Sequence, residues 1–231
     1  MNILDLIFPA RCAICDGILP LGERNICIPC KKKMKYISSQ VCLRCGKEVR
    51  EEEEYCYDCR RKDHVFDQGK AVFSYEFIRP SLYRFKYAGR KEYAYFYAKS
   101  IAEQLQEQCK LWKPQALVPV PLHPKKKKKR GYNQAEEIAV KLGEIWNLPV
   151  VNDLVLRCKN TRPMKEIVRT DRQNNLKKAF KLGQNKVKLK TIIIIDDIYT
   201  TGSTIDAVAK VCKSAGIDHV YFITVSIGNG L

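Results

Sequence analysis

The chain has 231 residues, enough to bury a full hydrophobic core in one large domain or in two unequal ones. It carries 42 lysines and arginines against 25 aspartates and glutamates, a net charge of +17, which favours polyanionic partners such as nucleic acids or phosphorylated substrates. No apolar run approaches the roughly 20 residues that cross a bilayer, and the first residues lack the basic start of a signal peptide, so we expect a cytoplasmic protein.

Eight of the eleven cysteines form four Cys-x-x-Cys pairs at nearly regular spacing: Cys12/Cys15, Cys27/Cys30, Cys42/Cys45 and Cys56/Cys59. Thiolates three positions apart on a tight turn can share one metal ion, and two such pairs complete a tetrahedron. In a reducing compartment the pattern favours zinc over disulfides. We predict two four-cysteine Zn²⁺ sites, from the first and second pairs and from the third and fourth, although spacing alone also allows a cross-braced pairing. Gly17 and Gly46 follow the second cysteine of two pairs and suit a turn that needs positive φ.

These pairs lie in a segment, residues 1–66, that has few large apolar residues, so bound metal should supply its folding energy. Four thiolates leave no open coordination position, and we therefore expect structural zinc. The segment holds 12 basic and 10 acidic side chains, so the positive excess lies almost entirely in residues 67–231, which we predict to be a second domain. Whether the ribbon contacts DNA or protein stays open, because the lysines between residues 31 and 35 favour DNA whereas Glu51–Glu54 oppose a uniformly basic face.

The second domain begins with alternating apolar residues, Val72–Phe77, that predict a strand. An aromatic and basic stretch follows and leads into a helix that should end near Gln108. Rings interleaved with cations are typical of a groove for single-stranded nucleic acid, but rings at helical spacing can equally fill a core. We expect core packing for most of these rings, and nucleic-acid contacts from Lys86 and Arg90.

Residues Ala116–Pro121 predict a further strand, whose two prolines place its end at a sheet edge or a ligand loop and allow a cis bond before Pro121. A run of cations comes next, followed by a helix through Trp146. A loop at a strand end of an α/β sheet faces the ligand crevice, although a plain solvated loop could carry the same charges. We predict that Arg130 contacts a pyrophosphate group. The preceding residues form a predicted nucleic-acid-binding patch: Lys125, Lys126, Lys127, Lys128 and Lys129.

A long, polar and basic stretch from Asn160 to Lys178 suits a flap that closes over a charged ligand. Within it, Arg172 is a further candidate for nucleic-acid contact.

The most informative motif is Ile192–Thr204, which reads Ile-Ile-Ile-Ile-Asp-Asp-Ile-Tyr-Thr-Thr-Gly-Ser-Thr. The isoleucines predict a strand buried on both faces, and an apolar stripe after the motif predicts a helix. The N–H groups at a helix start hold a phosphate, while carboxylates accept hydrogen bonds from a ribose diol and help to hold a divalent cation. A doubly wound domain with one capping aspartate would share each single element, but the combination indicates a site for a phosphorylated sugar.

We therefore assign a catalytic acid pair, Asp196 and Asp197. The predicted phosphate loop consists of Thr200, Thr201, Gly202, Ser203 and Thr204. This arrangement resembles the phosphoribosyl-pyrophosphate (PRPP) loop of type I phosphoribosyltransferases, with Mg²⁺ as the expected companion of PRPP.

Over essentially its whole length the chain resembles the ComF family (competence protein F, ComF/GntX), which pairs a double zinc ribbon with a phosphoribosyltransferase-like domain. The motifs that carry the resemblance are the four cysteine pairs, Lys86–Arg90, Val118–Pro121, Arg130–Gln134, Arg172–Asn175 with Ala179–Phe180, and Asp196–Thr204. The resemblance implies an α/β fold with a parallel sheet flanked by helices behind a small zinc ribbon. It also implies a role in natural transformation, with single-stranded DNA and a helicase-like protein as partners.

Together these inferences predict a protein that binds PRPP and single-stranded DNA. The alternative is an active phosphoribosyltransferase of nucleotide metabolism, whose acceptor is unknown because no side chain stands out as a base. A scaffold whose ribbon docks a translocase is a third reading.

Overall fold

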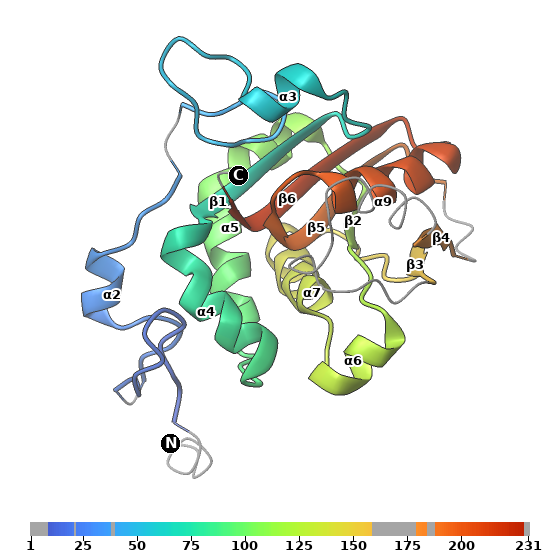
Figure 1. Cartoon of the computed structure of the whole chain (residues 1–231). Helices are drawn as coiled ribbons and strands as arrows, with labels where there is room; N and C mark the ends of the chain where they lie inside the picture. Colours follow the sequence, from blue (N-terminus) through green and yellow to red (C-terminus); the bar gives the residue numbers. More distant parts are fainter. Residues whose placement is uncertain (1–8, 21, 38–39, 159–178, 184–187, 229–231) are drawn as a thin grey trace.

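The computed structural model describes residues 9–20, 22–37, 40–158, 179–183 and 188–228. Their centre is a four-stranded, all-parallel sheet in the order β1-β6-β5-β2 (Figure 1). The strands are β1 (Gln68–Ser74), β2 (Ala116–Pro119), β5 (Thr191–Tyr199) and β6 (His219–Ile227). A separate antiparallel pair consists of β3 (Val155–Arg157) and β4 (Phe180–Leu182). The predicted α/β class with a parallel sheet is confirmed.

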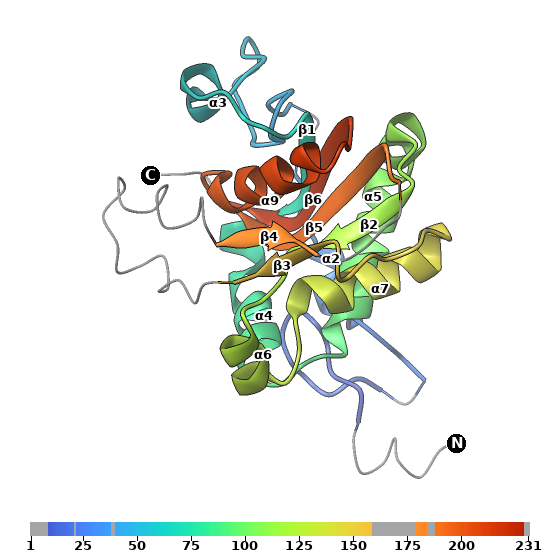
Figure 2. The same ribbon diagram turned by 90° about the vertical axis from the view of Figure 1, so that its right-hand side faces the viewer.

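Helices cover both faces of this sheet (Figure 2). One face carries α4 (Tyr75–Tyr87), α5 (Tyr93–Trp112) and α7 (Gln134–Trp146), and the other carries α9 (Ser203–Ser214) with the β3–β4 pair. Three shorter helices are α2 (Ile28–Lys32), α3 (Tyr57–Arg61) and α6 (Pro124–Arg130). Among the described residues, no helix combines the length and apolar character that a membrane crossing requires.

Strand β5 is buried on both faces, as its isoleucine run predicts. Ile192 and Ile194 are fully buried in the core beneath α9. Ile193 and Ile195, equally buried, belong to the core beneath α4, α5 and α7. Successive side chains of a strand point to opposite faces, so only an unbroken apolar run can serve both cores.

We use the word crevice for the region between the carboxyl ends of β5 and β2. These strands are direct neighbours, with Pro119 in register with Ile195. The chain leaves β5 toward α9 on one face and leaves β2 toward α7 on the other. Such a divergence opens a crevice at the carboxyl ends of parallel strands, where ligands of open α/β sheets bind.

Two predicted elements differ from the structure. Strand β1 begins earlier than expected and ends at Ser74, because Tyr75 starts a helix that buries Ile78 and Phe85. The cations before Gly131 form helix α6, where we expected a loop, since Pro124 occupies its first turn and the ring of His123 accepts a hydrogen bond from the N–H of Lys125. No peptide bond within the described segments is cis, so the bond before Pro121 is trans.

Both halves of the cysteine-rich segment make polar contacts with the sheet domain. Its first half rests on α4 and α5, where Asp16 accepts a hydrogen bond from Tyr93 and pairs with Arg90 at 2.9 Å. Its second half leads into His64, whose buried ring Nδ1 lies 2.9 Å from a carboxylate oxygen of Asp206 on α9.

Asp206 gathers three contacts from the chain that follows the second half of the ribbon. Besides His64, it accepts hydrogen bonds from Lys62 Nζ at 2.6 Å and from the N–H of Val65 at 2.9 Å. Burial disfavours the charge of Asp206, but the bonds from His64 and Lys62 outweigh this effect and lower its pKa. The carboxylate therefore fixes the ribbon to the first turns of α9.

We predict that Asp206→Ala lowers the free energy of unfolding by about 3 kcal/mol, because it leaves a buried imidazole and an ammonium group without their acceptor. Asp218→Ala is the matched control: Asp218 pairs with Lys190 at 3.0 Å, but both side chains are more than half exposed, so its loss should cost less than about 1 kcal/mol. Chemical denaturation of the zinc-loaded variants measures both values, and equal losses would contradict the anchoring role of Asp206.

Candidate functional site

The acid pair lies at the carboxyl end of β5. Asp197 is buried, and its Oδ2 lies 2.7 Å from Nζ of Lys86, which projects from α4. The N–H of Asp197 donates to Oδ1 of Asp196 at 2.9 Å, and Ser226 on β6 donates its hydroxyl to the carbonyl of Asp197 at 3.3 Å. Contacts from α4 and β5 thus hold the two carboxylates, and β6 holds the main chain of Asp197.

The charges of this pair are strongly coupled to their surroundings. Withdrawal from water, with the adjacent Asp197 carboxylate, raises the pKa of Asp196 well above its usual range. Burial disfavours the charge of Lys86, but the attraction of Asp197 outweighs it and raises the pKa of the ammonium group. Lys86 therefore stays charged beside the acid pair, and any further positive charge would stabilise the ionised form of Asp196.

Two arginines add positive charge near the acid pair, Arg157 through Asp196 and Arg130 through Lys86. Arg130, at the end of α6, donates to Oε1 of Gln134 at 2.9 Å. Arg157, at the end of β3, lies with its guanidinium carbon 5.2 Å from the ring centroid of Phe180. Burial lowers the pKa of Arg157, Asp196 opposes that shift, and Arg130 adds to it. Lys86, Arg130 and Arg157 therefore share one electrostatic neighbourhood with the acid pair, drawn from three separate elements.

The loop after β5 depends on a glycine in a left-handed conformation. Gly202 adopts φ of +74°, and a Cβ there would lie 2.7 Å from the hydroxyl of Tyr199 and 2.8 Å from Cε1 of His64. Both the backbone conformation and the space thus require glycine. The hydroxyls of Thr201 and Ser203 lie 3.0 Å apart at the start of α9. Helix-start N–H groups lack intrahelical acceptors, so this turn offers donors to an anion.

The structure brings together only part of the predicted site. Asp196, Asp197, Lys86 and Arg130 meet at the crevice, with Thr200–Thr204 following directly along the chain. Arg90 is drawn instead to Asp16 of the ribbon. Arg172 and the predicted flap from Asn160 to Lys178 lie outside the described residues.

Arg157 is a site residue that the sequence motifs did not reveal. It closes a short apolar stretch that begins at Leu154, and a single arginine at the end of such a strand was the available signal.

The patch residues Lys125–Lys129 lie on α6, and all but Lys126 are exposed. Burial lowers the pKa of Lys126, and the nearby Arg157 and Arg130 lower it further. Lys127 pairs with Glu136 at 2.7 Å. The remaining patch lysines, Lys125, Lys128 and Lys129, are exposed to solvent.

The aromatic stretch divides between core and surface. The predicted core packing is confirmed for Phe85, Tyr93, Phe96 and Tyr97, each at most 5% exposed. Three other rings of the stretch are exposed: Tyr83, Tyr87 and Tyr95.

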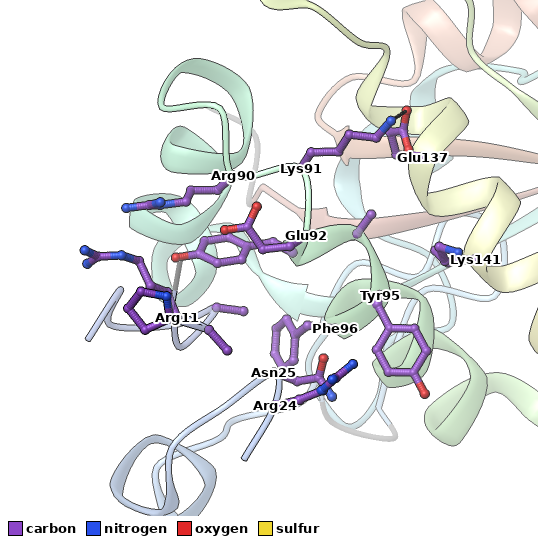
Figure 3. A pocket seen from close by; sticks show the side chains of 15 residues that line it. Arg11, Arg24, Asn25, Arg90, Lys91, Glu92, Tyr95, Phe96, Glu137 and Lys141 are labelled. Atoms are coloured by element: carbon purple, nitrogen blue, oxygen red, sulfur yellow. Dashed lines mark ion pairs between the residues drawn. The ribbon is translucent and has the colours of Figure 1, made fainter. Parts of the chain in front are cut away.

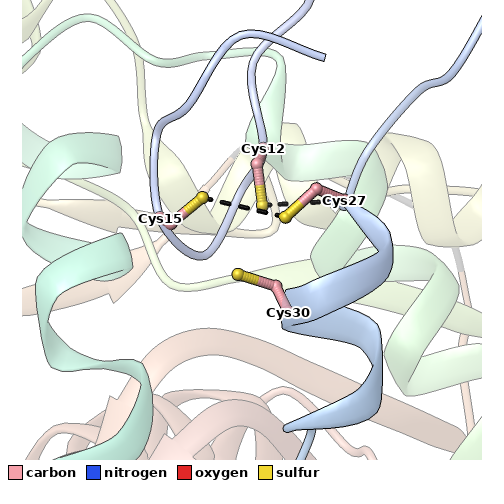
Figure 4. A group of neighbouring side chains, drawn as sticks. All are labelled: Cys12, Cys15, Cys27 and Cys30. Carbon is pink, nitrogen blue, oxygen red and sulfur yellow. Dashed lines mark hydrogen bonds between the residues drawn. The ribbon is translucent and has the colours of Figure 1, made fainter. Parts of the chain in front are cut away.

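The eight paired cysteines form two clusters, and in each the sulfur atoms all lie within 4.8 Å of one another (Figure 4 shows the first). Cys15 and Cys27 are 3.9 Å apart, and Cys45 and Cys56 are 3.6 Å apart. Tetrahedral zinc with Zn–S bonds of about 2.3 Å places its sulfurs about 3.8 Å apart, so both clusters fit Zn²⁺. The clusters join the first pair with the second and the third with the fourth, which excludes the cross-braced alternative.

The turn chemistry of the first cluster differs from the prediction. Positive φ falls on the residue directly after the second cysteine, which is Asp16 at 66° in the first cluster and Gly46 at 78° in the second. Gly17 is therefore not the left-handed residue. Aspartate tolerates this conformation, and here its carboxylate also anchors the ribbon to Arg90 and Tyr93.

A separate cleft of about 1200 Å³ lies between the first half of the ribbon and helices α5 and α7 (Figure 3). Within its lining Lys91 pairs with Glu137 at 2.9 Å, and Arg90 pairs with Asp16 of the ribbon. The acid pair does not line it.

Comparison with known proteins gives matches to both parts of the chain. A family model described as a double zinc ribbon domain matches residues 3–60. "Competence protein F" of Haemophilus influenzae is 30% identical, with 92% of this chain and 95% of that protein covered. "Competence protein ComFC" of Bacillus subtilis is 27% identical over 89% of each chain, and "DNA utilization protein YhgH" of Escherichia coli K12 is 26% identical over 91% and 94%.

Solved structures with some likeness are phosphoribosyltransferases. A xanthine-guanine-hypoxanthine phosphoribosyltransferase of Helicobacter pylori aligns with 60% of this chain and 82% of its own, at 21% identity and a TM-score of 0.34. An adenine phosphoribosyltransferase of Leishmania tarentolae aligns with 57% and 70%, at 12% identity and a TM-score of 0.36. Both scores are low, so the fold class rests on the sheet topology itself.

We predict that Cys12→Ser and Cys42→Ser each reduce the metal content from two zinc ions to one per chain, because three thiolates cannot hold a structural zinc tightly. The second change should be the more destabilising, since Cys42 belongs to the same core as Tyr199 and Ile205 whereas Cys12 does not. Elemental analysis counts the zinc and thermal denaturation ranks the variants. Two zinc ions in either variant would refute its ligand set.

Proposed function

This chain belongs to the competence protein F (ComF) family, and from that premise we propose that it binds PRPP and single-stranded DNA during natural transformation. The observation that carries the proposal is the acid pair at the end of β5, followed directly by a glycine-dependent turn at the start of α9. The relatives named for competence and for DNA utilization support the biological setting.

The PRPP part of the proposal follows from the chemistry of the crevice. The loop Thr200–Thr204 would hold the 5′-phosphate through backbone N–H groups and hydroxyls. Asp196 and Asp197 would accept hydrogen bonds from the ribose hydroxyls. Arg130 and Arg157 would neutralise the pyrophosphate, because Arg157 interacts with Asp196 and Arg130 lies near both Arg157 and Lys86.

The acid pair also fits Mg²⁺, whose preferred ligands are carboxylate and phosphate oxygens. Burial and the neighbouring carboxylate raise the pKa of Asp196, so a nearby cation would stabilise its ionised form. Bound with PRPP at these carboxylates, Mg²⁺ would supply positive charge for the pyrophosphate group.

The DNA part of the proposal rests on charge that the fold leaves exposed. Lys125, Lys128 and Lys129 make no ion pair within the described part of the chain, and all three are exposed on α6. This helix follows β2 at the same sheet edge as the acid pair. Unpaired surface cations attract the phosphates of nucleic acid and release counterions on binding.

For PRPP, we predict that Asp196→Asn combined with Asp197→Asn weakens binding by about 100-fold or more, because each carboxylate loses a charge-assisted hydrogen bond. Calorimetric titration of PRPP with Mg²⁺ into wild type and the double variant measures the loss. Asp218→Asn is the control, since Asp218 lies at the amino end of β6 and should leave the affinity unchanged.

Binding by wild type that survives in the double variant would remove the pocket assignment. Pyrophosphate release in the presence of candidate nucleobase or amine acceptors would move the protein to the active transferase class, with Asp196 and Asp197 still in the site.

For DNA, we predict that replacing Lys125–Lys129 with alanine weakens binding of single-stranded DNA. The salt dependence of log K should become shallower by about 0.7 for each DNA phosphate that a lysine no longer neutralises. Fluorescence anisotropy over a series of salt concentrations measures the slope. The matched variant replaces the lysine group at positions 31, 32, 33 and 35 of the ribbon. A slope changed only in that variant would place the DNA path across the ribbon and not across α6.

A further inference from the structure

Two tyrosines on α4 are exposed although they lie within an aromatic stretch most of whose rings pack in the core. Tyr83 is 63% exposed and Tyr87 is 60% exposed. Four residues apart on one helix, they share a face, and their ring centroids are 5.0 Å apart with the planes inclined by 48°. The core does not use these rings, since α4 buries Ile78, Leu82 and Phe85 on its other side.

Arginines flank the two rings along the same face. Arg79 lies one turn before Tyr83 and is exposed. At the other end, the guanidinium carbon of Arg130 lies 5.0 Å from the ring centroid of Tyr87, and its Nη2 donates to the tyrosine hydroxyl at 3.3 Å. The order along this surface is therefore cation, ring, ring, cation, drawn from α4 and from the end of α6.

This surface leads directly to the acid pair. Lys86 precedes Tyr87 in α4 and turns inward to Asp197, while Tyr87 turns outward beneath Arg130. Figure 2 shows α4 and α6 at the same end of the molecule, where the exposed lysines of α6 continue the positive charge. A polyanion held by α6 would thus pass over Tyr87 at the mouth of the crevice.

Exposed rings between cations match the chemistry of single-stranded DNA. Each base offers a π-face to an aromatic ring, and each phosphate offers a charge to an arginine or lysine. A protein partner would instead require an apolar surface with a shape of its own, whereas here charged groups border both rings.

We propose that Tyr83 and Tyr87 form a platform on which bases of single-stranded DNA stack, with Arg79 and Arg130 holding the adjoining phosphates. The inference rests on the proposed DNA-binding function and extends it, because it assigns affinity to the bases and not only to the phosphate backbone. The platform also leads the strand to the crevice that holds the acid pair.

The test compares two fluorescent probes of equal charge, an oligothymidine of about 20 nucleotides and an abasic strand of the same length. Wild type should bind the oligothymidine more tightly. Tyr83→Ala combined with Tyr87→Ala should weaken that binding about tenfold or more and leave the abasic strand unaffected, so that the preference disappears. Phenylalanine at both positions should restore the affinity to within about twofold, because the rings remain.

The matched control is Tyr57→Ala. Tyr57 on α3 is also 63% exposed and also carries an arginine, Arg61, 5.0 Å from its ring centroid. The Tyr57→Ala variant should bind both probes with the affinity of wild type. Its zinc content confirms that the ribbon is intact.

The outcomes separate the platform from the function on which it rests. If wild type binds neither probe, the proposed DNA-binding function is wrong. Binding by wild type with equal affinity for both probes, or an equal loss in the Tyr57 control, would overturn the platform alone. Oligouridine is measured in parallel. If the double alanine variant loses affinity for oligouridine only, the rings bind RNA and the DNA assignment is wrong.

Discussion

Burial of β5 on both of its faces is the constraint on which the rest of the structure depends. The strand lies between β2 and β6, and its isoleucines serve two separate cores. If β5 shifted by one residue in register, each of its side chains would face the opposite core. The burial of both faces therefore fixes the register of the strand. Asp196 and Asp197 are consequently delivered to one place, the end of β5 beside β2, where the following helices diverge. The site owes its position to the apolar residues that precede it.

The zinc-binding segment is integrated with this sheet domain through buried polar contacts. Bound zinc would fold each half of the ribbon, and polar groups from both halves contact helices of the domain. Asp16 reaches Arg90 and Tyr93, while His64 reaches Asp206. His64 also packs beside Gly202 in the predicted phosphate loop, so the shape of this loop depends partly on residues that follow the second pair of cysteine motifs. Near the predicted boundary at residue 66, Phe66 packs edge-on against Phe222, which joins the segment to the sheet.

Local patterns predicted the elements whose structure is determined locally. The β5 strand, its loop and helix α9 follow from consecutive residues, and the cysteine spacing identified the metal ligands. Features that depend on contacts between distant residues were harder to predict from the sequence. Whether Tyr75 continues a strand or starts a helix depends on the core that receives Ile78, and the role of Arg157 depends on a fold that brings β3 beside Asp196. The left-handed Asp16 was missed for the same reason, because its partners lie more than seventy residues away.

The charges of the crevice explain how one site could be stable alone and still accept a highly charged ligand. Two adjacent carboxylates withdrawn from water would repel each other strongly, and the raised pKa of Asp196 shows that cost. Lys86 offsets it through its ion pair with Asp197, and Arg157 adds attraction to Asp196. A ligand that carries both phosphates and a divalent cation can replace these internal contacts. Its cation would bind the carboxylates, and its phosphates would bind the arginines. Binding then leaves no bare charge in the crevice, whereas a phosphate without a cation, or a cation without a phosphate, would leave one set of groups unmatched.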